Sequence, residues 1–544
     1  MIVTARTLIL AAAAVAAACS FPAGASAGLR GPDSPRVTLP GDVSASAVRA
    51  DPTGWIVGAR PGRGSARIAR AHDARHIAGG AWRVERAAAR ALAADLRRAG
   101  LLSYAEPDRY STRAQGPAPD PLSPASPWRD RVVDPGLTPP AVSSSGPLIA
   151  LVDSQLDITH PEFASGNIAT TGGQALTDFH GTATAAVAAA AANGVGNLGV
   201  YPGARALNVT LPPQIPCSES ARQINAARRA GAAVINMSYG SVNECVTESD
   251  AIQRAVRAGI VPVAASGNEF QDDNPLEFPA SVAHVLTVAA LADNDQPTFF
   301  SSESIAVDLS APGLNILTAV PRRPGEDFDG DGTVDGFASV SGTSFSAPMV
   351  SGAVAWIRAA RPELTQDQVQ NVLRFGARDV GAPGYESATG YGILSVGGAL
   401  GRQAPPPDPA EPNDDIRFVN GRTFRTPAAP IFRTNGKAVA LSATADVAED
   451  PVDVYKLRLR ARSRATVRLA PSVGDPDLYA YTGSASSVRR SRSVARSRQG
   501  EGRTDTVTVR NRRGRAATFF VAVGFTEKDD RELLNASYEL RVTR

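Results

Sequence analysis

The chain has 544 residues, of which 43% are hydrophobic, and a formal net charge of +3 at pH 7. Its length exceeds that of one ordinary domain and favours roughly three folded units. The hydrophobic content, together with 49 Gly and 41 Pro residues, excludes a fibrous or disordered chain and indicates a loop-rich globular protein.

Residues 1–27 contain the parts of a secretory signal peptide: Arg6, an apolar run, and small residues at the end, Ala25-Ser26-Ala27. We therefore expect a secreted, extracellular protein from which this segment is removed. Two alternatives stay open, a membrane anchor formed by the same segment and a lipid attached to Cys19. Since no later run reaches the roughly 18 apolar residues of a membrane span, we expect none.

Residues 28–118 are expected to hold a leader and a small α+β unit, folded over about 48–111. Within it, the pattern predicts a strand at 54–60, a helix at 81–100 and a strand at 101–110. A stretch rich in Pro, Ser and Ala follows, and such a linker is open to proteolysis.

Residues 119–402 are expected to form an α/β domain. Short apolar, β-branched runs alternate there with helical stretches, which predicts a parallel sheet buried on both faces. The runs occupy residues 147–153, 206–211, 233–240, 260–268 and 285–291. In such domains ligands bind at the carboxyl ends of the strands, where Asp153 and Asn268 lie.

A proline-rich linker at 403–410 precedes a last unit, residues 411–544. This unit shows strand alternation with almost no helical signal, which predicts an antiparallel β-sandwich. Its Arg-rich segment 488–503 is interpreted as a solvated hairpin rather than as a site for a polyanion.

Four motifs contain the residue types of a serine hydrolase. They are LVDSQLDITHPEF with Asp153, DFHGTATAAVAAA with His180, AASGNEF with Asn268 and SGTSFSAPMVSGAVA with Ser344. In these motifs the chain resembles the subtilisin-like serine peptidases over about residues 120–400, most specifically in GTSxSAP. The resemblance implies a subtilisin-like fold, a Ser344 nucleophile, a His180 base oriented by Asp153, and an oxyanion held by Asn268 and the Ser344 amide.

The residue types support the same assignment. A serine hydroxyl is a poor nucleophile unless a base takes its proton, and a third group must orient that base. In the first turn of an apolar helix, Ser344 would lie beside unpaired N–H groups and the positive end of the helix dipole. Ser341, Ser346 and Ser351 are the alternative nucleophiles. The family motif assigns this role to the serine directly after Gly-Thr, which is Ser344, and a serine one helical turn away would lie roughly 5 Å from that position.

The family resemblance also implies a substrate site. Substrate backbone is expected to add as a strand along the segment NMSYG, and the residues implied to contact substrate are Ser238, Tyr239, Gly240, Ala265, Ser266 and Gly267. Gln155 and Phe179 depart from the family, which usually has glycine at both positions. Asp272 and Asp273 could attract a basic substrate residue, although exposed loop acids are the preferred interpretation.

Two further features concern stability. Once the signal peptide is removed, Cys217 and Cys245 remain, and in an exported chain we expect them to form a disulfide rather than stay as buried thiols. The segment DFDGDGTVDG resembles the calcium loops of exported bacterial proteins and suits a structural Ca²⁺, with an acidic surface loop as the alternative. Its candidate ligands are Asp327, Asp329, Asp331 and Asp335.

Two more resemblances complete the prediction. Residues 104–108 are similar to the inhibitory propeptides of these peptidases, and the last unit resembles the pre-peptidase C-terminal domains of secreted proteases. Together they imply a secreted, monomeric serine endopeptidase, made as a self-processed precursor that is cut within 111–125, with polypeptide substrates and no nucleic-acid partner. The alternative is a catalytically silent adhesion or scaffold protein that binds through its basic last unit.

Overall fold

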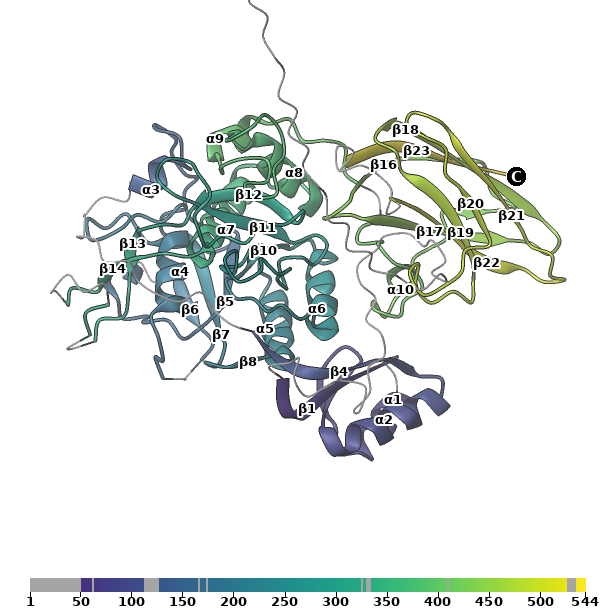
Figure 1. Ribbon diagram of the computed structural model, residues 1–544, viewed down its shortest axis with the longest axis horizontal. Coiled ribbons are helices and arrows are strands. Elements are labelled where there is room, and N and C mark those ends of the chain that lie inside the picture. The colour runs from purple at the N-terminus through teal and green to yellow at the C-terminus, as the bar shows by residue number, and fades with distance from the viewer. Residues whose placement is uncertain are drawn as a thin grey trace, which may run out of the picture.

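The computed structural model describes residues 50–60, 63–111, 127–164, 167–172, 175–323, 326–328, 334–408, 410–525 and 535–544. They form an N-terminal α+β unit, a central α/β unit and a C-terminal β-sandwich (Figure 1). The expected signal peptide lies outside these residues, as does most of the expected cleavage segment. Among the helices described, none has the length and apolar character needed to cross a membrane.

The N-terminal unit is one sheet covered by two helices. Its elements are β1 (Ala50–Ala59), α1 (Arg63–Arg70), β2 (Arg75–Ala78), β3 (Ala81–Glu85), α2 (Arg86–Arg98) and β4 (Leu102–Ser111). The prediction of a helix from residue 81 was wrong for its first five residues, which form β3, and α1 was missed. In β3, buried Trp82 and Val84 alternate with Arg83 and Glu85, and this period of two is the strand pattern.

The central unit contains a seven-stranded sheet in which every neighbouring pair is parallel. In spatial order its strands are β12 (Val307–Pro312), β11 (Leu286–Leu291), β10 (Val261–Ala265), β9 (Val234–Met237), β5 (Leu148–Asp153), β7 (Arg205–Thr210) and β6 (Ile168–Thr170). Every residue of β5, β9, β10, β11 and β12 is buried, as expected for strands covered on both faces.

Helices on the two faces of this sheet explain that burial. Ile149 and Leu151 of β5 pack in one cluster with α4 (His180–Ala189), α7 (Thr343–Ala360), α8 (Gln366–Gly376) and α9 (Val396–Gly401). Ala150 and Val152 pack on the other face with α5 (Cys217–Arg229) and α6 (Val246–Val256). Smaller elements of this unit are α3 (Pro127–Asp130), η1 (Pro161–Phe163), β8 (Ile215–Pro216), β13 (Ile316–Ala319) and β14 (Phe337–Val340).

Close packing of α4 against α7 sets the positions of two candidate catalytic residues. A Cβ atom on Gly352 would lie 2.9 Å from the carbonyl oxygen of Ala188, so only glycine allows this approach. Since His180 is the first residue of α4 and Ser344 the second of α7, the packing of the two helices fixes the distance between their first turns.

The C-terminal unit is an antiparallel β-sandwich, as predicted, with one parallel pair at an edge. One sheet contains β15 (Phe432–Arg433), β17 (Val452–Leu459), β22 (Ala517–Gly524), β19 (Asp477–Thr482) and β20 (Ala495–Ser497). The other contains β16 (Val439–Asp446), β23 (Asn535–Thr543), β18 (Arg464–Val473) and β21 (Asp505–Arg510), and the short helix α10 (Ile416–Val419) precedes both.

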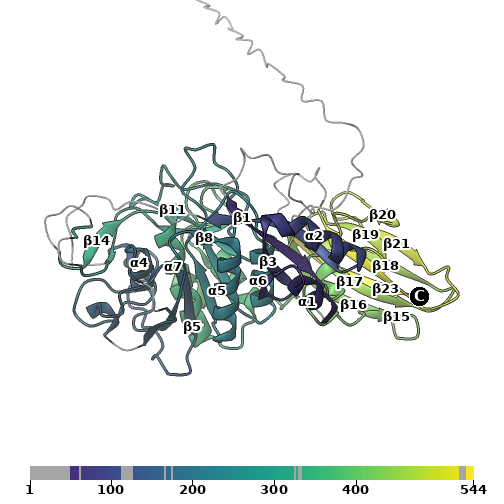
Figure 2. The same ribbon diagram turned by 90° about the horizontal axis from the view of Figure 1, so that it is seen from below.

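Both other units contact the central one. In Figures 1 and 2 the N-terminal unit lies against the ends of α5 and α6, and β4 pairs with β8. On the sandwich side, the buried Arg374 of α8 lies 3.0 Å from Asp308 and 2.6 Å from Asp446, and His284 lies 2.9 Å from Asp414. Buried ion pairs therefore join the sandwich to the central unit.

Candidate active site

Asp153 and His180 form a buried hydrogen-bonded pair. Asp153 is the last residue of β5, and its Oδ1 lies 2.7 Å from His180 Nδ1. The same carboxylate accepts bonds from Thr184 Oγ1 at 3.0 Å and from the Ser154 N–H at 2.7 Å. Because an ionised carboxylate can only accept, His180 Nδ1 carries the proton and Nε2 presents its lone pair.

His180 Nε2 is buried and forms no hydrogen bond with any described residue. The start of α7 lies beside it, since the ring of Phe345 is 5.6 Å from the imidazole, measured between centroids. The preceding residue, Ser344, donates its hydroxyl to the carbonyl oxygen of Ser238 at 3.2 Å instead of to Nε2. Bonds between a nucleophile and its base are often long or poorly aligned without substrate, so this geometry is compatible with the predicted roles.

Asn268 lies three residues beyond the end of β10 and is bonded to the first residue of α7. Its Oδ1 accepts the Thr343 N–H at 3.0 Å and the Thr343 hydroxyl at 3.1 Å. With the oxygen held in this way, the Nδ2 group is turned away from Thr343 and remains a donor. The amide of Ser344 is among the first-turn N–H groups that have no partner within a helix.

The three rival serines have structural hydrogen bonds. Ser341 Oγ accepts a backbone N–H at 3.0 Å, and Ser346 Oγ donates to two backbone carbonyls at 3.2 and 3.0 Å. Ser351 Oγ donates to Asn236 Oδ1 at 2.9 Å. None of these four contacts joins its serine to His180.

The segment expected to bind substrate lies next to Ser344. Ser238 Oγ donates to the carbonyl oxygen of Ser344 at 2.8 Å. Tyr239 is buried, and its hydroxyl donates to Glu248 at 3.0 Å, so its side chain points into the core. Ala265, the last residue of β10, and Ser266, the residue after it, are buried as well.

The two positions that depart from the family pattern have ordinary packing partners. Gln155 Oε1 accepts a hydrogen bond from the Thr210 hydroxyl at 3.0 Å. The ring of Phe179 contacts that of Phe328 at 5.7 Å between centroids. Neither substitution removes a group of the predicted site.

Similarity to known proteins covers the central unit of the chain. Residues 144–392 match the model of the Subtilase family. Subtilisin BL of Lederbergia lenta is 30% identical over 268 residues, which cover 47% of this chain and 93% of subtilisin BL. The chain belongs to the subtilase family.

Fervidolysin of Fervidobacterium pennivorans is 31% identical over 296 residues, 47% of this chain and 41% of fervidolysin, so the alignment spans under half of either sequence. The crystal structure of fervidolysin, described as a keratinolytic enzyme related to subtilisin, matches 91% of this chain and 96% of that one. The TM-score is 0.58 at 18% identity, a likeness that shows the fold alone.

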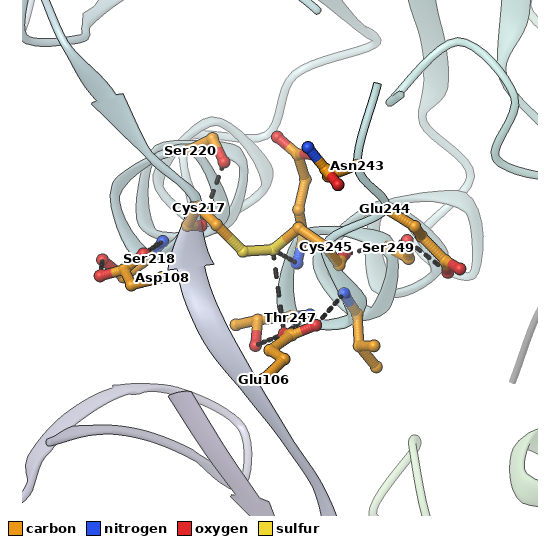
Figure 3. Close-up of a disulfide and its surroundings, with 12 residues drawn as sticks. Glu106, Asp108, Cys217, Ser218, Ser220, Asn243, Glu244, Cys245, Thr247 and Ser249 are labelled. Atoms are coloured by element: carbon orange, nitrogen blue, oxygen red, sulfur yellow. Dashed lines mark hydrogen bonds between the residues drawn. A yellow bond between two sulfur atoms is a disulfide. The ribbon is translucent and has the colours of Figure 1, made fainter. Parts of the chain in front are cut away.

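The predicted disulfide of this subtilase is confirmed. Cys217 is the first residue of α5 and Cys245 is the N-cap of α6, and a bond joins their sulfur atoms, with the Cα atoms 6.1 Å apart (Figure 3). The bond therefore ties together the N-termini of two neighbouring helices.

Two acids of the N-terminal unit bind those same helix ends (Figure 3). Glu106 accepts the N–H groups of Val246 and Thr247 at 2.9 and 3.1 Å. Asp108 accepts the N–H and the hydroxyl of Ser218 at 2.9 and 2.7 Å. Each carboxylate lies at the positive end of a helix dipole, which favours its charge. Both acids belong to the propeptide-like motif at 104–108, but their partners on α5 and α6 are over 100 residues away in the sequence, so no local pattern connects them.

The predicted calcium loop is only partly described. Asp329 and Asp331 lie outside the described residues, and Asp335 Oδ1 accepts the N–H of Phe337 at 2.8 Å. The loop therefore stays a prediction.

A second acidic group, which no sequence motif indicated, lies at the β-sandwich. Asp408, Glu411 and Asp453 each place one carboxylate oxygen within 4.8 Å of the others. Burial and neighbouring negative charge raise the pKa of Asp408 to about 8, and burial raises that of Asp453 to about 7.

Proposed function

We propose that this subtilase is a serine endopeptidase that works through an acyl-enzyme. Ser344 Oγ attacks the carbonyl carbon of the scissile bond while His180 Nε2 takes its proton, and Asp153 stabilises the imidazolium that forms. Asn268 Nδ2 and the Ser344 N–H donate to the oxyanion of the tetrahedral intermediate. The observation that carries the proposal is His180 itself: Nδ1 is bonded to Asp153, and Nε2 is buried without a partner among the described side chains.

The remaining steps use the same groups. His180 gives its proton to the leaving amine as the peptide C–N bond breaks, which leaves an ester on Ser344. Water then attacks the ester, His180 removes a proton from the water, and that proton returns to Ser344 Oγ as the acid product leaves. Polypeptides are therefore the substrate class.

We also propose that the protein is made as a secreted precursor. The signal peptide of residues 1–27 would direct export, and the N-terminal unit would act as an intramolecular inhibitor until it is cut within 111–125. The contacts of Glu106 and Asp108 with α5 and α6 support this role, because they attach the unit to the central unit through five hydrogen bonds.

Labelling with a serine-directed fluorophosphonate tests the proposal. The wild-type chain is expected to shed its N-terminal unit and to be labelled, whereas Ser344→Ala should do neither. Ser341→Ala is the matched control, since it removes a neighbouring hydroxyl whose bond is structural, and it should still be labelled. A folded wild-type chain that is neither labelled nor processed would instead support the silent scaffold.

A further inference from the structure

A buried carboxylate lies next to the candidate site without being part of its triad. Glu277, in the loop between β10 and β11, has only 5% of its surface exposed. A Cβ atom on Gly240 would lie 2.5 Å from Glu277 Oε2, and one on Gly267 would lie 2.6 Å from Glu277 Cγ. The Glu277 side chain therefore lies between the substrate segment that ends at Gly240 and the segment that leads into Asn268.

A second carboxylate accompanies it. Glu269 accepts the N–H of Asn268 at 2.5 Å, and its Oε2 would lie 2.9 Å from a Cβ atom on Gly267. Burial, followed by the charge of Glu269, raises the pKa of Glu277 to about 8. Within the described ranges, neither acid forms an ion pair with a basic side chain of the protein.

Such a pair is costly in the empty enzyme. Burying a carboxylate without a cation is unfavourable, and a second carboxylate beside it adds repulsion. A guanidinium or ammonium group supplied by a ligand would remove both costs, and a guanidinium can donate to two carboxylates at once.

The position of the pair identifies which substrate residue would supply that cation. The oxygen of the reacting carbonyl would lie at Asn268 Nδ2, and the residue that owns this carbonyl carries its side chain on the next atom, Cα. Gly267 precedes Asn268 in the chain and contacts Glu277, so this side chain would start within reach of the pair. Both neighbouring positions are glycine, so no Cβ atom obstructs the approach to Glu277.

We infer that Glu277, supported by Glu269, selects Arg or Lys as the substrate residue on the amino side of the cleaved bond. This specificity rests on the proposed function. The acids that the sequence suggested for such a role, Asp272 and Asp273, are exposed and belong to no such arrangement.

The chain's own sequence offers a matching substrate. Within 111–125, where the precursor is expected to be cut, Arg113 is the one basic residue. Selection of a basic residue therefore predicts cleavage after Arg113 and a mature N-terminus at Ala114.

Peptides that differ only in the residue before the cleaved bond test the inference. With the self-processed enzyme at pH 9, where the Glu277 carboxyl is charged, kcat/KM for Arg and Lys peptides is expected to exceed that for a Gln peptide by about 10²-fold. Glu277→Gln should reduce the Arg-to-Gln ratio by a similar factor, and Asp273→Asn should leave the ratio unchanged. Titration with a fluorophosphonate counts the active sites in each preparation. If Glu277→Gln does not fold, Glu269→Gln replaces it as the test variant and should reduce the Arg-to-Gln ratio by a smaller factor.

The outcomes separate the two proposals. If titration shows active sites but Arg and Lys peptides have no advantage over Gln, the specificity inference is overturned and the endopeptidase stands. If no sites are titrated, the proposed function itself fails. N-terminal sequencing of the mature chain adds an independent readout, and a junction at a bond that follows an acidic or apolar residue would count against the inference.

Discussion

The amide oxygen of Asn268 accepts the backbone N–H of Thr343 at 3.0 Å, which joins the loop after β10 to the start of the helix that carries Ser344. This bond orients the Asn268 side chain before substrate arrives, so its Nδ2 donor needs no reorganisation when an oxyanion forms.

The first prediction concerns this donor. Asn268→Leu keeps similar bulk but removes the donor, and kcat is expected to fall about 10²–10³-fold with little change in KM. Thr343→Ala keeps the backbone N–H that Asn268 Oδ1 accepts and loses only the hydroxyl's bonds to Asn268 and Gly267, so its loss of kcat should be smaller. Steady-state kinetics on one peptide would check both, and equal losses in the two variants would contradict the assignment of Asn268 as a donor.

The second prediction concerns the N-terminal unit. Glu106→Gln, made in a Ser344→Ala chain that cannot cut itself, weakens charge-assisted bonds to the start of α6. We expect a loss of about 1.5–3 kcal/mol in the free energy that docks the unit. The control is Glu85→Gln, because Glu85 is 67% exposed and lies 3.9 Å from its partner Arg83. In thermal unfolding, Glu106→Gln should lower the midpoint more than Glu85→Gln does. Equal midpoints for the two variants would show that the contacts of Glu106 with α6 do not stabilise the docked unit.

The third prediction concerns the joint with the β-sandwich. Arg374→Met leaves Asp308 and Asp446 buried without their shared cation, which typically costs 3–5 kcal/mol when one partner of a buried pair is removed. Arg378→Gln is the control, since Arg378 is 53% exposed and its pair with Asp295 is at the surface. Unfolding and limited proteolysis near residue 408 would measure the difference. If Arg374→Met destabilised the protein no more than Arg378→Gln does, contacts other than the Arg374 ion pairs would hold the β-sandwich against the central unit.

Sequence patterns predicted the fold where burial is continuous and local. The strand β5 was predicted within one residue, because six successive buried residues need a sheet covered on both faces. The pattern failed at β3, where a five-residue strand runs directly into α2 without a turn.

The candidate site, like the fold, could be predicted from the sequence only in part. Asp153, His180, Asn268 and Ser344 lie in motifs that are recognisable one at a time, whereas the part played by an acid such as Glu277 depends on residues that fold next to it from elsewhere. Gly240 is 37 positions before Glu277, and no local pattern connects the two. Partners distant in sequence, rather than weak motifs, limited what could be predicted.

The fourth prediction concerns calcium, which we expect to bind the loop around Asp327 and Asp335. A ligand at 100 times its dissociation constant stabilises the folded state by about 2.7 kcal/mol, so a chelator should lower the unfolding midpoint and added Ca²⁺ should restore it. The Asp327→Asn/Asp335→Asn variant should respond less. If that variant responds as the wild type does, the loop is not the site, and the group of Asp408, Glu411 and Asp453 becomes the place to test.

The last prediction concerns pH and follows from the raised pKa of Glu277, about 8. Below that pH the carboxyl is protonated and neutral, and above it the charge that attracts Arg is present. The ratio of kcat/KM for Arg and Gln peptides should therefore rise between pH 6 and pH 9, a range in which the guanidinium stays charged. The ratio removes any pH dependence that both peptides share, and the other carboxylate that faces Glu277 is that of Glu269. Glu277→Gln should flatten the ratio across the whole range, and a wild-type ratio that is constant with pH would show that no carboxylate titrates where the substrate side chain binds.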